Sequence, residues 1–149
     1  MDQTDYHTAL IEFGTPEFDE ALQLRNDVLR RPLGLVFSPE DIAAEFDQHH
    51  LGLYDANWRL VACLTLQQKD DKTMKMRQVA VAAPWQGRGL GARLVQGAEV
   101  FCRERSFSKI ELNARDTAVP FYLGLYYEKV GEPFTEVGIK HYKMQKILS

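Results

Sequence analysis

The stretch APWQGRGLGARL, residues 83–94, places three glycines within five residues directly before a helical pattern. It follows the apolar, β-prone run VAVAA, residues 79–83, whose composition predicts a strand buried on both faces. A glycine-rich turn between a strand and a helix favours anion binding, because the first N–H groups of the helix lack intrahelical partners. Glycines let the backbone approach a phosphate closely, and Arg88 adds positive charge. The stretch therefore predicts a phosphate-binding turn.

The glycines fit two different spacings, each typical of a different phosphate-containing ligand. Residues 87–92 fit G-x-G-x-x-A, the dinucleotide fingerprint, and Glu111 or Asp116 lies at a suitable distance to meet a ribose. Against this, residues 83–86 separate the fingerprint from its strand, and three predicted strands come earlier in the chain. Too few residues follow Glu111 for the second half of a doubly wound sheet. The second spacing, Q-x-x-G-x-G over residues 86–91, is therefore favoured.

Hydrophobic periodicity predicts one mixed α/β sheet with helices on its faces. Thr15-Pro16 and Ser38-Pro39 are typical helix starts, with a cap residue followed by proline. The segment 30–37 is expected to be loop or irregular helix. The predicted strands are 7–13, 49–55, 59–68, 73–83, 107–114, 130–136 and 140–147, and the predicted helices are 16–31, 41–46, 89–105 and 117–129.

Composition limits the classes of protein that fit. The length of 149 residues predicts one domain, 1–149, and the net charge of −3 argues against a nucleic-acid partner. No apolar run is long enough to cross a bilayer, and the first ten residues lack a signal-peptide pattern. Two cysteines, Cys63 and Cys102, are too few for a disulfide framework, which favours reduced thiols and a cytoplasmic location. No metal-ligand spacing is present, so no metal site is predicted.

Three segments carry a resemblance to a known family. RQVAVAAPWQGRGLGARLV, residues 77–95, resembles the core motif of the GNAT N-acetyltransferase superfamily, R/Q-x-x-G-x-G/A after an apolar strand. LNARDTAVPFYLGLYYEKVGEPF, residues 112–134, is similar to the second signature of that family. The ending GEPFTEVGIKHYKM, residues 131–144, resembles small bacterial members related to ElaA. The resemblance covers about half of the chain and implies a GNAT-type, mostly antiparallel sheet flanked by helices in the order βααβββαβαββ.

The resemblance also implies a donor and a set of binding residues. The donor would be acetyl-CoA, with an acceptor amine attacking its thioester directly. The pantetheine amides would pair with the backbone of Val79, Ala80 and Val81. The loop and the helix start would hold the pyrophosphate, through Gln86, Gly87, Arg88, Gly89, Leu90, Gly91 and Ala92.

The catalytic assignments rest on the same resemblance. An amine with a reference pKa near ~10.4 must lose a proton before it attacks, so a base or a desolvating site is needed. Glu136 and His141 are the candidate bases, and Tyr122 matches the usual proton donor to the departing thiolate. Each has an alternative interpretation: Tyr122 as part of an aromatic core, Glu136 as a solvated charge, His141 as a packed or surface histidine. Tyr126 stands where the family has glycine, so either the helix ends differently or Tyr126 adopts a left-handed conformation.

These observations predict an acetyl-CoA-dependent N-acetyltransferase. A small-molecule amine is the expected acceptor, because the chain is compact, acidic and without a docking extension; a protein amino group is the alternative. A non-catalytic domain that binds or senses acyl-CoA is the second class of function. No membrane contact is expected, and a homodimer through the C-terminal strands is an open expectation of the fold.

Overall fold

The computed structural model describes residues 5–35 and 37–149. Two parts of the chain lie outside the described residues. They are residues 1–4, which belong to the first ten residues that lack a signal-peptide pattern, and Val36, which belongs to the predicted irregular segment 30–37. The chain forms two compact units. One comprises the chain up to Gln67 together with Gln78–Ala98, and the other comprises Gln68–Arg77 and Glu99–Ser149.

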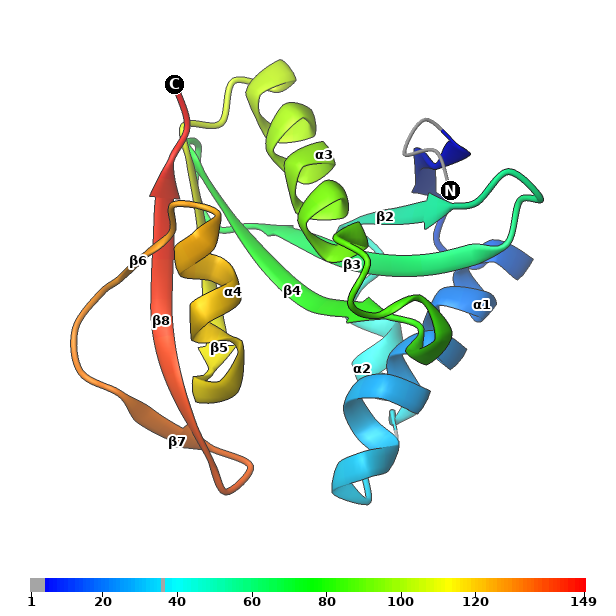
Figure 1. The fold of residues 1–149 in the computed structure, drawn as a ribbon, viewed down its shortest axis with the longest axis horizontal. Coiled ribbons are helices and arrows are strands. Elements are labelled where there is room, and N and C mark those ends of the chain that lie inside the picture. The colour runs from blue at the N-terminus through cyan, green and yellow to red at the C-terminus, as the bar shows by residue number, and fades with distance from the viewer. Residues whose placement is uncertain (1–4, 36) are drawn as a thin grey trace. The chain divides into compact units, whose positions relative to one another are not determined.

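Strands and helices follow the predicted α/β order, with one further strand near the C-terminus (Figure 1). The strands are β1 (His7–Ile11), β2 (His49–Tyr54), β3 (Leu60–Gln68), β4 (Thr73–Val81), β5 (Lys109–Arg115), β6 (Glu128–Lys129), β7 (Phe134–Glu136) and β8 (Ile139–Ile147). The α-helices are α1 (Pro16–Arg25), α2 (Pro39–Ala43), α3 (Leu90–Glu104) and α4 (Val119–Gly124). The hydrogen-bonded strand order is β1-β2-β3-β4-β5-β8-β6, and β7 pairs with β8. This is the mixed, mostly antiparallel sheet that the sequence predicts.

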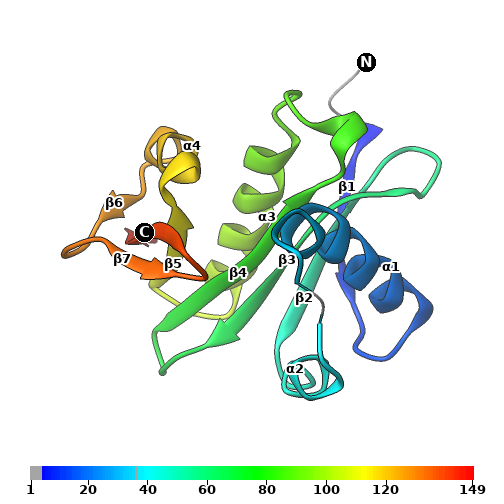
Figure 2. The ribbon, with the colours of Figure 1, turned by 90° about the horizontal axis from the view of Figure 1, so that it is seen from below.

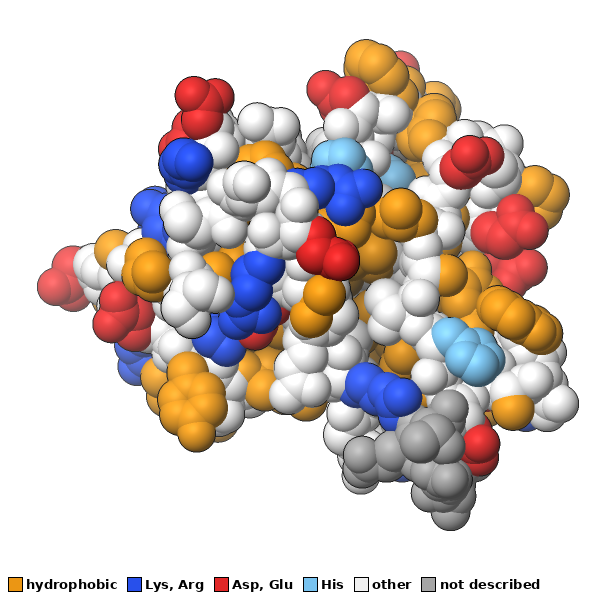
Figure 3. Space-filling model, turned by 90° about the horizontal axis from the view of Figure 1, so that it is seen from above, with side chains coloured by type: hydrophobic (Ala, Val, Ile, Leu, Met, Phe, Trp, Pro, Cys, Tyr) orange, Lys and Arg blue, Asp and Glu red, His pale blue; other side chains and the backbone are white. Residues whose placement is uncertain are grey.

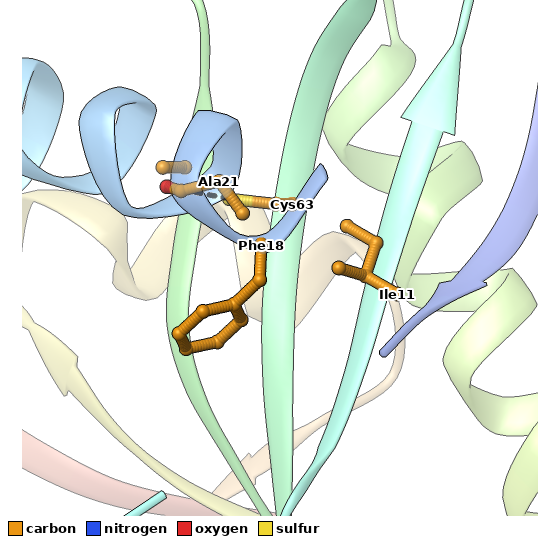
Figure 4. Close-up of a cluster of buried hydrophobic side chains, with 5 residues drawn as sticks. Ile11, Phe18, Ala21 and Cys63 are labelled. Atoms are coloured by element: carbon orange, nitrogen blue, oxygen red, sulfur yellow. Dashed lines mark hydrogen bonds between the residues drawn. The ribbon is translucent and has the colours of Figure 1, made fainter. Parts of the chain in front are cut away.

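The core of the first unit lies beneath α1. Helix α1 begins where predicted, because the Thr15 hydroxyl accepts a hydrogen bond from the Phe18 N–H at 3.2 Å and proline occupies the first turn. Phe18 and Ala21 of α1 face Ile11 of β1 and Cys63 of β3 (Figure 4), and Ala80 of β4 belongs to the same buried cluster. This packing holds the end of β4 against α1.

Helix α3 contacts the other face of β1. Gly97 of α3 comes so close to Thr8 that a Cβ at position 97 would lie 3.0 Å from the Thr8 hydroxyl oxygen. Successive residues of a strand point to opposite faces, so Thr8 faces α3 whereas Ile11 faces α1. The first turns of α3 and the whole of α1 therefore cover opposite faces of the first unit.

The second unit is built around the pair β5–β8. The two strands pair antiparallel along seven residues, from Lys109↔Ile147 to Arg115↔His141. The parallel pairing of β4 with β5 covers only Thr73–Lys75 of β4. Helix α4 lies beside β5 (Figure 2), and β6 and β7 pair with β8.

Three segments depart from the prediction. The helix expected over 117–129 is shorter: α4 ends at Gly124, and Tyr126 then adopts a left-handed φ of 72°, which turns the chain into β6. Of the strand expected over 130–136, only β7 forms, and β6 lies in the segment that was expected to be helical. At the N-terminal side, the helix expected to reach residue 31 continues from α1 as a π-helical turn, 26–30, and a 3₁₀ turn, 31–33.

Strand β4 is also less buried than predicted. Its apolar run was expected to be covered on both faces, yet Ala80 alone of Val79–Val81 is buried, and Val79 and Val81 are half-buried. Gln78 has a φ of 56°, a left-handed conformation typical of bulges in strands. The strand thus presents one side of residues 79–81 to the α1 core and leaves the other partly open.

Candidate active site

The glycine-rich loop links β4 to α3 within the first unit. After Val81, a single 3₁₀ turn, Ala83–Trp85, precedes the loop, and α3 starts at Leu90. The first helical hydrogen bond runs from the Arg93 N–H to the Gly89 carbonyl at 3.2 Å. The N–H groups of residues 90–92 therefore have no intrahelical acceptor, and the dipole of the 15-residue helix adds positive potential there.

The two glycines before the helix are needed for their backbone conformation. Gly87 and Gly89 have φ values of 78° and 76°, a region that side-chain-bearing residues rarely adopt. A Cβ at either position would have no atom within 4 Å, so close packing inside the protein does not explain them. The Gln86 side chain donates a hydrogen bond to the Val81 carbonyl at 2.8 Å, which ties the loop to the end of β4. The result is an exposed, fixed turn with open space beside it, as a phosphate requires.

A pocket of about 250 Å³ adjoins this loop on the same unit. Trp85 and Arg88 line it together with residues of the turn between β2 and β3. The Arg59 guanidinium lies 5.2 Å from the Trp85 ring centroid and donates to the Asp55 carboxylate at 3.0 Å. The sequence predicts the strands 49–55 and 59–68 but gives no sign of this contact, because it depends on the pairing of the end of β4 with β3, where the Ala82 N–H donates to the Val61 carbonyl at 2.8 Å.

Tyr122 lies in the middle of α4 and is buried, with 7% of its surface exposed. Its ring meets the rings of Phe121 and Tyr127 edge-on, with centroids 4.9 Å and 5.8 Å away. Burial raises the pKa of Tyr122 above its ordinary value, so the hydroxyl keeps its proton at neutral pH. The structure confirms that Tyr122 is packed in an aromatic cluster, and its role as proton donor stays a prediction.

Glu136 and His141 sit on one hairpin, β7–β8. His141 is buried and stacks on Phe134, with ring centroids 5.7 Å apart. Its Nδ1 lies 2.8 Å from the Ile139 carbonyl oxygen, which can only accept, so Nδ1 carries a proton and Nε2 is the nitrogen that has a lone pair whenever the ring is neutral. Glu136 pairs with Ile139 next to the hairpin turn and is exposed. The hairpin therefore holds His141 rigidly and leaves Glu136 in solvent.

The two cysteines are free and buried, and burial raises the pKa of each thiol to about 12. Neither is suited to nucleophilic chemistry at neutral pH. In residues 5–35 and 37–149, no three His, Cys, Asp or Glu side chains gather in a way that could hold a metal ion. The same residues contain no helix of the length and apolarity needed to span a membrane. On the face shown in Figure 3, basic and acidic side chains are interspersed.

The fold matches a known family of proteins. A family model described as an acetyltransferase (GNAT) domain matches residues 27–148, most of the chain. The chain therefore belongs to the GNAT acetyltransferase family, whose acyl donor is acetyl-CoA.

Individual relatives support this fold. The chain is 31% identical over 77 residues to the uncharacterized protein YyaT of Bacillus subtilis, an alignment covering 52% of each chain. The matched parts of three curated relatives range from 19% to 65% of their lengths, so the chain spans only part of each. The structure of Escherichia coli ElaA superposes with a TM-score of 0.79 at 19% identity, covering 95% of this chain and 99% of that one. A GNAT acetyltransferase from Elizabethkingia anophelis with acetyl-CoA bound gives a TM-score of 0.74 at 18% identity, covering 98% and 100%.

Proposed function

We propose that the protein is an acetyl-CoA-dependent N-acetyltransferase that acetylates a small primary amine. The observation that carries the proposal is the pair of left-handed glycines, Gly87 and Gly89, at the start of α3 in a chain of the GNAT family. These glycines leave open space at a helix N-terminus directly after an apolar strand. That combination suits a ligand with a phosphate group and an extended chain.

Acetyl-CoA would lie along the end of β4 and the start of α3. The backbone of Val79, Ala80 and Val81 is the proposed partner of the pantetheine amides, and these residues lie beyond the part of β4 that pairs with β5. The pyrophosphate would accept hydrogen bonds from the N–H groups of residues 87–92, and Arg88 would add its charge. Gln86 would act through its bond to the Val81 carbonyl, which fixes the loop.

The reaction is direct transfer. The acceptor nitrogen attacks the thioester carbonyl carbon, a C–N bond forms, the C–S bond breaks, and the coenzyme A thiolate leaves. In this scheme Tyr122 gives its proton to the departing sulfur, and the proton that the nitrogen releases on becoming an amide replaces it. Burial raises the pKa of Tyr122, which keeps the hydroxyl protonated before the step.

The base is assigned to His141 rather than Glu136. The Ile139 carbonyl fixes the His141 tautomer, so that the unprotonated Nε2 is the atom able to accept the proton of the ammonium group. Glu136 is exposed beside the hairpin turn, where its carboxylate is solvated. We therefore propose that Glu136 attracts a cationic acceptor and that His141 takes its proton.

A panel of amines, assayed for thiol release from acetyl-CoA, tests the function. Tyr122→Phe should lower kcat by about a hundredfold, the usual scale for losing a general acid, and leave the Kd of coenzyme A unchanged. Tyr126→Phe, which alters an exposed ring nearby, is the matched control and should retain full activity. Tight acetyl-CoA binding without thiol release for any amine would instead identify an acyl-CoA-binding domain.

The loop has a separate test by calorimetry. Gly89→Ala introduces a Cβ at a left-handed position and should weaken coenzyme A binding by about tenfold. Gly131→Ala, also left-handed but remote in sequence, is the control and should bind normally. Equal affinities in both variants would show that the loop does not hold the pyrophosphate.

A further inference from the structure

Tyr127 connects Tyr122 to a buried charged group. The Tyr127 ring packs edge-on against Tyr122, with centroids 5.8 Å apart and an interplanar angle of 72°. The Tyr127 N–H also donates to the Tyr122 carbonyl at 3.0 Å. Tyr122 is therefore held by Tyr127 through both its ring and its backbone.

The position of Tyr127 is itself fixed by Glu99 of α3. The Tyr127 hydroxyl donates to Glu99 Oε2 at 3.0 Å, and only 2% of Tyr127 and 4% of Glu99 are exposed. Glu99 Oε1 accepts from Lys146 Nζ of β8 at 2.9 Å, and Arg103 Nη2 lies 3.8 Å away. A buried carboxylate with this set of partners has one stable orientation, because each oxygen has its own donor.

The chain path near Tyr127 is unusual as well. Tyr126 takes a left-handed φ of 72°, and this reversal brings Tyr127 back against the helix that carries Tyr122. A phenylalanine at position 127 would preserve the ring packing, but it would leave Glu99 Oε2 without its donor. The hydroxyl of Tyr127 therefore sets the orientation of the side chain, whereas the ring alone accounts for its burial.

We propose that the Glu99–Tyr127 hydrogen bond is a positioning device that sets the ring orientation of Tyr122 for proton transfer. The proposal rests on the proposed function, because it assigns Tyr127 a role through Tyr122. Tyr127 does not itself touch the reacting atoms. It acts as a positioning residue, and Glu99 acts through it. Proton transfer depends steeply on the placement of the donor, so a small rotation of Tyr122 lowers the rate without weakening cofactor binding.

The test uses protein in which all six tyrosines are replaced by 3-fluorotyrosine. The ¹⁹F resonance of Tyr122 is identified by its loss in Tyr122→Phe. In Tyr127→Phe this resonance should shift or broaden and kcat should fall by about tenfold, while the Kd of coenzyme A stays within about twofold. Tyr126→Phe removes the neighbouring, exposed hydroxyl and should change neither the resonance nor kcat.

A double-mutant cycle separates positioning from a general loss of structure. Glu99→Leu, which has no hydrogen-bonding group, should affect kcat in the same direction. Glu99→Leu with Tyr127→Phe should be no worse than the more severe single variant, since each removes the same hydrogen bond. An unchanged Tyr122 resonance in Tyr127→Phe, an altered resonance with unchanged kcat, or multiplicative losses in the double variant would overturn the proposal. An unaltered kcat in Tyr122→Phe would contradict the proposed function instead, because Tyr122 would then not be the proton donor. The fluorine spectrum still reports whether Tyr127 positions the Tyr122 ring, since it does not depend on that role.

Discussion

The guanidinium of Arg25 and the carboxylate of Glu45 meet in two hydrogen bonds, 2.7 Å from Nη1 to Oε1 and 2.6 Å from Nη2 to Oε2. Both side chains are buried, and the pair joins the end of α1 to the segment between α2 and β2. On its other side the Arg25 guanidinium lies 4.6 Å from the ring centroid of Phe37. Within the described residues Arg25 Nε has no hydrogen-bond partner, so Glu45 supplies the main compensation for this buried charge.

Removing the charge of Glu45 should therefore destabilise the protein strongly. Glu45→Gln leaves the Arg25 cation buried without a counter-charge, and the expected loss in the free energy of unfolding is about 3–5 kcal/mol. Arg31→Met breaks the exposed pair with Asp27 and should cost less than about 1 kcal/mol. Urea unfolding of the two variants measures the difference, and similar losses would contradict the assignment.

His50 predicts a fall in stability at acidic pH. It is buried, its Nε2 donates to the Glu45 carbonyl at 3.2 Å, and its Nδ1 lies 3.1 Å from the Thr65 hydroxyl, an arrangement that fits the neutral ring. Burial lowers the pKa of His50 below its ordinary value of 6.5. The unfolded chain then binds a proton that the native state does not, so the stabilisation is complete above pH 6.5 and decreases as the pH falls below it.

Unfolding curves at several pH values give the measurement for His50. His50→Gln should flatten the acid side of the stability curve, whereas His7→Gln, at an exposed position, should leave it unchanged. If His50→Gln and the unaltered protein lose stability in parallel from pH 7 to about pH 5, native His50 takes up the proton readily and the prediction is wrong.

Tyr126 should be replaceable by glycine with a gain in stability. Its φ of 72° costs a side-chain-bearing residue about 1 kcal/mol, and its ring is 84% exposed, so little packing is lost. Tyr126→Gly should raise the free energy of unfolding by about 0.5–1 kcal/mol, part of the relief being offset by the flexibility of glycine in the unfolded chain. Tyr126→Ala keeps the Cβ and should show no gain. Equal stability of the two variants would mean that the backbone here is unstrained.

Gly97 illustrates how packing opposes helix propensity. Alanine is favoured over glycine inside a helix by about 1 kcal/mol, but a Cβ here would lie 3.0 Å and 3.2 Å from the hydroxyl oxygen and methyl carbon of Thr8. We expect Gly97→Ala to be destabilising in the natural sequence and stabilising in a Thr8→Ala background. Thermal unfolding of the four proteins of this cycle measures the coupling, and additive effects would show that Thr8 moves aside freely.

Local signals in the sequence were the most reliable. The helix starts at Thr15 and Ser38 are confirmed because a cap and a following proline act on adjacent residues, and both hydroxyls accept the expected N–H bonds. The turn between β4 and α3 is confirmed for the same reason. The family motif also predicts the acyl donor, acetyl-CoA, but it does not predict where individual side chains lie.

Contacts between distant residues were outside the reach of the sequence patterns. Glu99 and Lys146 are 47 residues apart. From the sequence, Glu99 is only a polar position of the helix predicted over 89–105, and nothing in its pattern indicates the contact with Lys146. The helix prediction over 117–129 was wrong at its end because aromatic residues at helical spacing continue to Tyr127. The family's glycine at position 126 did offer a left-handed Tyr126 as one of two alternatives, and the structure confirms that alternative. The assignments of Tyr122, Glu136 and His141 remain predictions, since their chemistry depends on a bound substrate.

The left-handed residue Gln78 has a consequence for β4 as a whole. Met74 lies opposite Ile110 and Met76 is two residues further along, so both belong to one alternating series of buried positions. Ala80, the next buried residue along the strand, belongs to the cluster beneath α1, and the half-buried Gln78 lies between it and Met76. A single strand therefore supplies buried side chains to both compact units, and its left-handed residue stands where the chain passes from one unit to the other.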